Sequence, residues 1–280
     1  MPIAKRVKRA LWSGLGWLGK ALGLGGVPIL TYHSIDDSGS LISVSPAAFA
    51  AQMEYLHRHG FRALSLRDYV ARLPLGSLPA RRAFVITFDD GFRNVHEVAL
   101  PILRRLGFTA TVFVPTDHVG GSATWTMRPG LPQLPLMSWA ELAELQAAGF
   151  DIQSHACSHP FLTSLTPTEA AREIVESKRT LERALHNTTD LFCFPYGDRD
   201  RAVAEILEGS GYRGAVSLEF GLNSPGDDPF GLRRVGSAHF TSPAKFEACV
   251  WGMYAPLLRA RLRLRAALGG KRPDPRREPI

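Results

Sequence analysis

Short apolar runs alternate along the chain with segments that have helical periodicity. The apolar runs are rich in β-branched and aromatic residues and predict buried strands at Val27–Tyr32, Ala83–Phe88, Thr109–Val114, Phe150–Gln153, Leu191–Phe194 and Tyr212–Ser217. The periodic segments predict helices at Pro46–His59, Val95–Leu106, Ser138–Ala148, Thr166–His186 and Arg201–Gly209. This alternation predicts parallel βα units, and therefore an α/β barrel or a doubly wound sheet.

Several predicted helices begin and end at residues suited to those positions. Ser138 precedes Glu141 by three residues, and Thr166 precedes Glu169 by the same spacing, which is the pattern of a capping box. Pro167 occupies a first helical position. Glycines suited to ending a helix come directly before a Phe at Gly60, Gly107 and Gly149. The segment from Thr116 to Leu136 has no clean period, and an unstructured stretch of that length predicts a functional or mobile loop.

Composition and charge indicate a globular protein and argue against one that binds nucleic acid through its fold. The 280 residues are 45% hydrophobic and 21% charged, as in a soluble globular protein, and they suffice for one barrel of about 250 residues. The net charge of +7 is uneven: residues 1–26 carry +5 and residues 257–280 carry +6, which leaves −4 on residues 27–256. An acidic body with basic ends argues against a nucleic-acid groove through the fold.

These patterns divide the chain into three parts. Residues 27–256 form the predicted globular domain, and residues 257–280 a basic helix followed by a charged, proline-rich tail. In residues 1–26, leucines share one helical face beside two tryptophans and basic residues, an interfacial pattern. We therefore expect a cytoplasmic protein held peripherally at the inner membrane by its basic ends, with an export signal or a poorly ordered leader as alternatives. No run reaches the roughly 18 apolar residues of a membrane span.

Two clusters of chemically reactive residues follow predicted strands. Asp89 and Asp90 come directly after Ala83–Phe88, and His155 and His159 follow Phe150–Gln153. Taken alone, the aspartate pair is more often a capped strand-to-helix turn, and the histidine pair can be one capping and one exposed histidine. Together, at the carboxyl ends of parallel strands, they favour a catalytic metal site, because two imidazoles and a carboxylate with a water form a known zinc arrangement.

Two further groups stand at strand ends. His33 follows the first strand, and Pro195, Tyr196 and Gly197 follow Leu191–Phe194. A single histidine and a Pro-Tyr-Gly turn are each more often structural. Their common position would nevertheless bring them to the same face of a barrel as the carboxylates and imidazoles.

The motifs together resemble a known family. The segment Thr87–Gly91 with its paired aspartates, the His155-x-x-x-His159 pair and the Phe-x-Phe-Pro-Tyr-Gly sequence resemble the NodB-type polysaccharide deacetylases, carbohydrate esterase family 4, over about residues 27–237. The segment Leu30–Ile35 further resembles the circularly permuted branch that deacetylates poly-N-acetylglucosamine. The resemblance implies a distorted (β/α)7 barrel and a hydrolase that removes N-acetyl groups from a polysaccharide, an oligosaccharide or a lipid-linked glycan.

The resemblance also implies roles for individual residues. The metal ligands would be Asp90, His155 and His159, holding zinc, or alternatively cobalt or nickel. Asp89 would be the general base and His33 the general acid. The backbone at Tyr196, after Pro195, would help to hold the oxyanion.

One departure from the family pattern concerns the partner of Asp89. Many members carry an arginine two residues before the proline of the third motif, where this chain has Cys193. Arg233 and Arg234 are the best substitutes, and we favour Arg234 as the supporting residue.

Two other functions compete with the enzyme. One is a catalytically silent carbohydrate-binding relative that uses Trp125 or Trp139 as a sugar platform. The other is a membrane or nucleic-acid adaptor that works through the basic ends. We favour the enzyme because all five side chains implied by the family are present: Asp89, Asp90, His155, His159 and His33.

Overall fold

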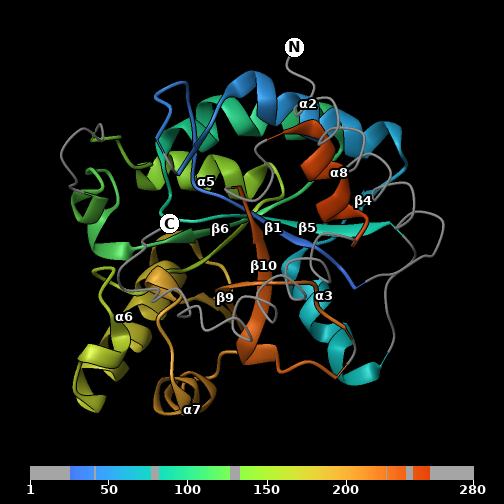
Figure 1. The fold of residues 1–280 in the computed structure, drawn as a ribbon. Helices are drawn as coiled ribbons and strands as arrows, with labels where there is room; N and C mark the ends of the chain where they lie inside the picture. The colour runs from blue at the N-terminus through green and yellow to red at the C-terminus, as the bar shows by residue number, and fades with distance from the viewer. Residues whose placement is uncertain are drawn as a thin grey trace, which may run out of the picture.

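The computed structural model describes residues 26–40, 42–76, 82–126, 133–224, 226–237 and 242–252. The basic ends, predicted to contact a membrane, lie outside the described residues, except for Gly26. Within the described part, strands lie at the centre and helices surround them (Figure 1). The arrangement is a closed parallel barrel, which confirms the predicted (β/α)7 fold and excludes an open doubly wound sheet.

Seven parallel strands form the barrel. Their order around it is β1 (Ile29–Tyr32), β10 (Leu232–Gly236), β9 (Gly214–Phe220), β8 (Leu191–Cys193), β7 (Asp151–Ser154), β6 (Thr111–Val114) and β5 (Ala83–Phe88). The ring closes because β1 pairs with β5 in parallel over four residues of each strand. The short β4 (Arg62–Ala63) pairs with the start of β5, and β2 (Ser34–Ile35) pairs with β3 (Ser43–Val44).

Most of the helices follow the predicted segments. They are α2 (Pro46–Arg58), α3 (Leu66–Arg72), α4 (Leu100–Leu106), α5 (Trp139–Ala147), α6 (Pro167–Leu185), α7 (Arg201–Gly209) and α8 (Pro243–Val250). Both predicted capping boxes are present at α5 and α6. The predicted helix over residues 95–106 begins as a π turn at Val95–Ala99, before Pro101, which has no N–H to donate to a regular helical turn.

The sequence patterns did not predict α3, β10 or α8. The sequence of Leu232–Gly236 does not predict a buried strand, because it contains two adjacent arginines. Helix α3 closes the amino-terminal end of the barrel, where its buried Leu66, Tyr69 and Val70 pack with interior residues of the strands.

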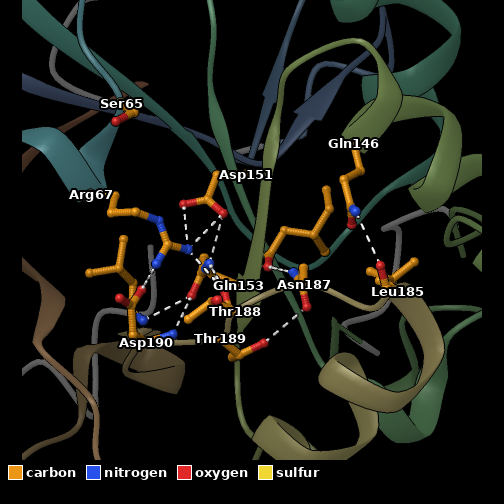
Figure 2. Close-up of polar contacts among 12 residues, drawn as sticks. Ser65, Arg67, Gln146, Asp151, Gln153, Leu185, Asn187, Thr188, Thr189 and Asp190 are labelled. Carbon is orange, nitrogen blue, oxygen red and sulfur yellow. Dashed lines mark hydrogen bonds and ion pairs between the residues drawn. The ribbon is translucent and has the colours of Figure 1, made fainter.

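A polar network strengthens the same end of the barrel (Figure 2). Arg67 on α3 forms ion pairs with Asp190 and with Asp151, the latter over 3.1 Å, and donates to the carbonyl of Thr188. The side-chain oxygen of Gln153 accepts from the backbone N–H of Asp190 over 3.0 Å. These contacts join α3 to the starts of β7 and β8, far from the strand ends that carry the predicted chemistry.

Residue alternation along β5 separates an apolar lower layer from a polar upper layer inside the barrel. Ala83 and Val85 pack among interior apolar side chains, whereas Thr87, on the same face, lies 3.3 Å from Thr31 of β1. The next residue with this orientation is Asp89, just beyond the strand. The strand period thereby places a carboxylate at the upper end of the barrel interior.

Candidate active site

The candidate residues converge at the carboxyl ends of four strands. His33 follows β1, Asp89 and Asp90 follow β5, His155 begins the loop after β7, and Tyr196 lies in the turn after β8. Because every barrel strand runs in the same direction, these ends lie on one face of the barrel.

The backbone is strained at this face. Non-glycine residues with positive φ include Asp90 (70°), Ala156 (64°), His159 (61°) and Tyr196 (57°). Such conformations cost about 1–3 kcal/mol each and persist only where surrounding contacts impose them. These residues are concentrated in the site loops, which indicates that the positions of the site side chains are maintained at the cost of backbone strain.

Asp90, His155 and His159 are buried and converge on one point. The Nε2 atoms of His155 and His159 lie 3.5 and 3.3 Å from Oδ1 of Asp90. Ligands about 2.1 Å from a tetrahedral zinc ion stand about 3.4 Å apart. The spacing therefore fits three protein ligands of a single divalent ion.

The hydrogen bond on the far side of His155 supports this interpretation. Its Nδ1 lies 2.8 Å from the carbonyl oxygen of Cys193, which can only accept, so Nδ1 carries a proton. In the neutral ring Nε2 then presents a lone pair to the Asp90 carboxylate. The two atoms face each other favourably only with a cation between them, either a proton or a metal ion, and a backbone partner of this kind is typical of metal-bound histidine.

Glu173 of α6 holds the loop that carries both histidines. One carboxylate oxygen accepts from the backbone N–H groups of Cys157 and Ser158, each over 2.9 Å, and the other accepts from the Ser158 hydroxyl over 2.8 Å. The sequence analysis missed this residue, because nothing in the helical pattern of α6 distinguishes it from the exposed acidic residues of the same helix.

Arg234 of β10 is the partner of Asp89. Its Nη1 and Nη2 donate to the two carboxylate oxygens over 2.8 and 2.6 Å, and both side chains are almost fully buried. Its Nε donates to the carbonyl of Ser217 over 2.8 Å. Arg233, the other candidate, points elsewhere and pairs with Asp227 over 2.6 Å.

This guanidinium determines the charge state of Asp89. Burial by itself would raise the pKa of Asp89, but the charge and hydrogen bonds of Arg234 outweigh burial and leave the pKa below its usual value. Burial likewise opposes ionisation of Asp90, yet the hydrogen bonds of His155 and His159 hold its pKa well below the ordinary range. Both carboxyl groups are therefore ionised at neutral pH.

His33 approaches Asp89 from the other side. Its Nε2 lies 3.8 Å from Oδ2 of Asp89, and its side chain is 14% exposed, so it sits at the opening of the site. An imidazole, which can donate a proton, thus lies beside a carboxylate, which can accept one.

Aromatic rings enclose His159. Trp125, from the long loop predicted to be functional or mobile, stacks on the imidazole at 4.7 Å with an interplanar angle of 17°. Tyr196 meets the imidazole edge-on at 4.5 Å. Trp139, the other tryptophan considered as a sugar platform, begins α5 and packs against the main hydrophobic core.

Comparison with known proteins identifies relatives over most of the described chain. The sequence model described as polysaccharide deacetylase matches residues 78–215. YxkH of Bacillus subtilis, which is assigned to the polysaccharide deacetylases, is 29% identical over 227 residues, covering 81% of this chain and 77% of that protein. The poly-β-1,6-N-acetyl-D-glucosamine N-deacetylase of Staphylococcus aureus is 24% identical over 69% of this chain and 67% of its own length.

Solved structures share the fold. The deacetylase PplD of Streptococcus pyogenes, solved in complex with acetate, superposes with a TM-score of 0.71 at 24% identity, covering 81% of this chain and 98% of that chain. The seven-stranded barrel is therefore an architecture already known among deacetylases.

The Arg234–Asp89 pair leads to a testable prediction. Replacing Arg234 by Gln removes the charge that lowers the pKa of Asp89, so the acidic limb of the pH–rate profile should move to higher pH. The unpaired buried carboxylate should also cost about 3–5 kcal/mol of folding stability. Arg234→Lys, which keeps the charge, should show a smaller shift of the limb.

The control is Arg233→Gln, on the same strand but paired with Asp227. It should leave the acidic limb where it is. An unchanged limb in both Arg234 variants, measured on folded protein, would show that Arg234 does not tune Asp89.

Proposed function

The chain belongs to the polysaccharide deacetylase family, and from this we propose that it hydrolyses the N-acetyl groups of a glycan in a metal-dependent reaction. The observation that carries the proposal is the buried Asp90–His155–His159 group with ionised Asp89 beside it at the mouth of the barrel. Asp90, His155 and His159 would hold a divalent ion, which would polarise the acetyl carbonyl and lower the pKa of a water bound to it. Zinc suits two imidazoles and one carboxylate, and cobalt or nickel are the alternatives.

The side chains of the protein supply the proton transfers. Asp89 accepts a proton from the attacking water, and Arg234 orients its carboxylate while keeping it ionised. His33 donates a proton to the departing nitrogen, so that the C–N bond breaks to give acetate and a free amine on the sugar. We assign the backbone N–H of Tyr196, directly after Pro195, to the oxyanion that develops on the carbonyl.

The substrate we propose is a polymer of N-acetylglucosamine. The support is the relative in Staphylococcus aureus, whose named activity is deacetylation of poly-β-1,6-N-acetyl-D-glucosamine. Shorter oligosaccharides and lipid-linked N-acetylated sugars are the alternatives, and acetate release from a panel of the three substrate types separates them.

Removal of the metal should abolish acetate release, and added zinc, cobalt or nickel should restore it. His155→Ala removes one of three protein ligands and should lose both stoichiometric metal and activity. His96→Ala, which changes a histidine paired with Glu144 outside the site, is the matched control. A His155→Ala enzyme with full metal content and full activity would overturn the ligand assignment.

The two limbs of the pH–rate profile should trace to Asp89 and His33. Asp89 must be ionised to accept a proton and His33 protonated to donate one, so kcat should fall at low and at high pH. Asp89→Asn should lower kcat by about a thousandfold while metal binding persists. His33→Ala should remove the alkaline limb, and unchanged kcat at every pH would exclude His33 from the mechanism.

We also propose peripheral membrane contact through residues 1–26 and 257–280, which carry +5 and +6. Basic residues near an anionic leaflet contribute about 1 kcal/mol each. No helix in the described part of the chain is long and apolar enough to span a bilayer. Full-length protein should sediment with anionic vesicles at low salt and be released as salt rises, and protein that stays in the supernatant at low salt would end this proposal.

A further inference from the structure

Phe161 is an exposed aromatic residue at the mouth of the barrel. Among the described residues, the large apolar side chains with high exposure are Phe161 at 43% and Leu75 at 74%. Leu75 belongs to the short turn after α3, at the closed end of the barrel. Phe161 instead follows His159 by two residues, beside the candidate metal site.

The ring of Phe161 stacks flat on the ring of Tyr196. The centroids are 4.0 Å apart and the planes differ by 11°. Tyr196 in turn contacts the His159 imidazole at 4.5 Å. Phe161 is thus one aromatic ring away from a proposed metal ligand, in direct continuation of the site.

The two rings are fixed by the loops that carry them. Thr163, two residues after Phe161, donates from its backbone N–H and its hydroxyl to the carboxylate of Asp198, over 2.8 and 2.9 Å. Asp198 itself stands two residues after Tyr196. Leu162, between Phe161 and Thr163, is buried in the cluster beneath α6 and α7. These contacts therefore fix the position of the stacked Phe161 and Tyr196 rings.

An exposed aromatic face beside a carbohydrate site has a specific use. A pyranose ring with equatorial substituents presents flat faces of axial C–H groups, which carry partial positive charge. The face of an aromatic ring is negative and apolar, so it attracts such a surface. Tyr196 stacks on Phe161, yet Phe161 is still 43% exposed, so part of its side chain is available for such a contact.

We propose that Phe161, supported by Tyr196, binds the sugar unit adjacent to the one that loses its acetyl group. The inference rests on the proposed deacetylase function and deepens it: the preferred substrate is a chain of gluco-configured units rather than a single sugar. Phe161 acts as a specificity residue, which improves binding of longer substrates and leaves the chemical step unchanged.

The test compares acetate release from N-acetylglucosamine oligomers of increasing length by wild-type protein, Phe161→Ala, Phe161→Trp and Leu75→Ala. Phe161→Ala should raise KM about tenfold for the longer oligomers, keep kcat, and leave the monomer unaffected. Phe161→Trp should restore the preference for longer chains, and Leu75→Ala should match wild type. Thermal unfolding of each variant checks that the fold is retained.

Three outcomes overturn the proposal: an equal loss on every length, a loss in kcat alone, or no loss at all. Calorimetric binding of the longest oligomer to the metal-loaded proteins separates this failure from failure of the deacetylase function. If wild-type protein releases no acetate from any glycan, the deacetylase proposal fails. Weaker oligomer binding by Phe161→Ala would then still support the platform, and equal binding would refute it.

Discussion

Two adjacent carboxylates buried at the upper end of the barrel impose the constraint on which the rest of the site depends. Asp89 and Asp90 are 1% and 4% exposed, and neither could stay ionised there without a compensating charge. Arg234 compensates Asp89 through two parallel hydrogen bonds. Asp90 instead faces two imidazoles spaced to share a cation with it. Because their charges are compensated by different partners, the neighbouring aspartates Asp89 and Asp90 can play different chemical roles.

The compensation of Asp89 also explains the presence of Cys193. The Cys193 thiol lies against the Arg234 guanidinium, 3.2 Å from Nη2, while its carbonyl oxygen lies 2.8 Å from Nδ1 of His155. An arginine at this position of β8 would compete with Arg234 for the same carboxylate. With a small side chain on β8, the arginine of β10 can cross the barrel interior and reach Asp89.

The two ends of the barrel divide stability from function. At the amino-terminal end, α3 and the Arg67 network tie strands together without strained backbone among the residues that form them. At the carboxyl end, the site loops contain non-glycine residues with positive φ, which are strained. Contacts of Glu173 and between Thr163 and Asp198 hold these loops in place. This division is usual for parallel barrels, in which loops can vary while the strands remain a rigid scaffold. It allows the site to carry strain that the rest of the fold offsets.

The sequence alone determined most of the strands and helices, although not α3, β10 or α8, because apolar periodicity and helix caps are local properties. It also placed Asp89, Asp90, His155, His159 and Tyr196 at strand ends, because strand direction follows from the βα alternation. The sequence favoured Arg234 over Arg233, but only the tertiary structure gave the reason, since which of two neighbouring residues on a strand faces the interior depends on the register of β10 in the barrel. The tertiary structure alone separated Trp125, which stacks on His159, from Trp139, which packs against the core. It alone also revealed the contacts of Glu173 with the histidine loop and of Phe161 with Tyr196, because these contacts join segments far apart in sequence.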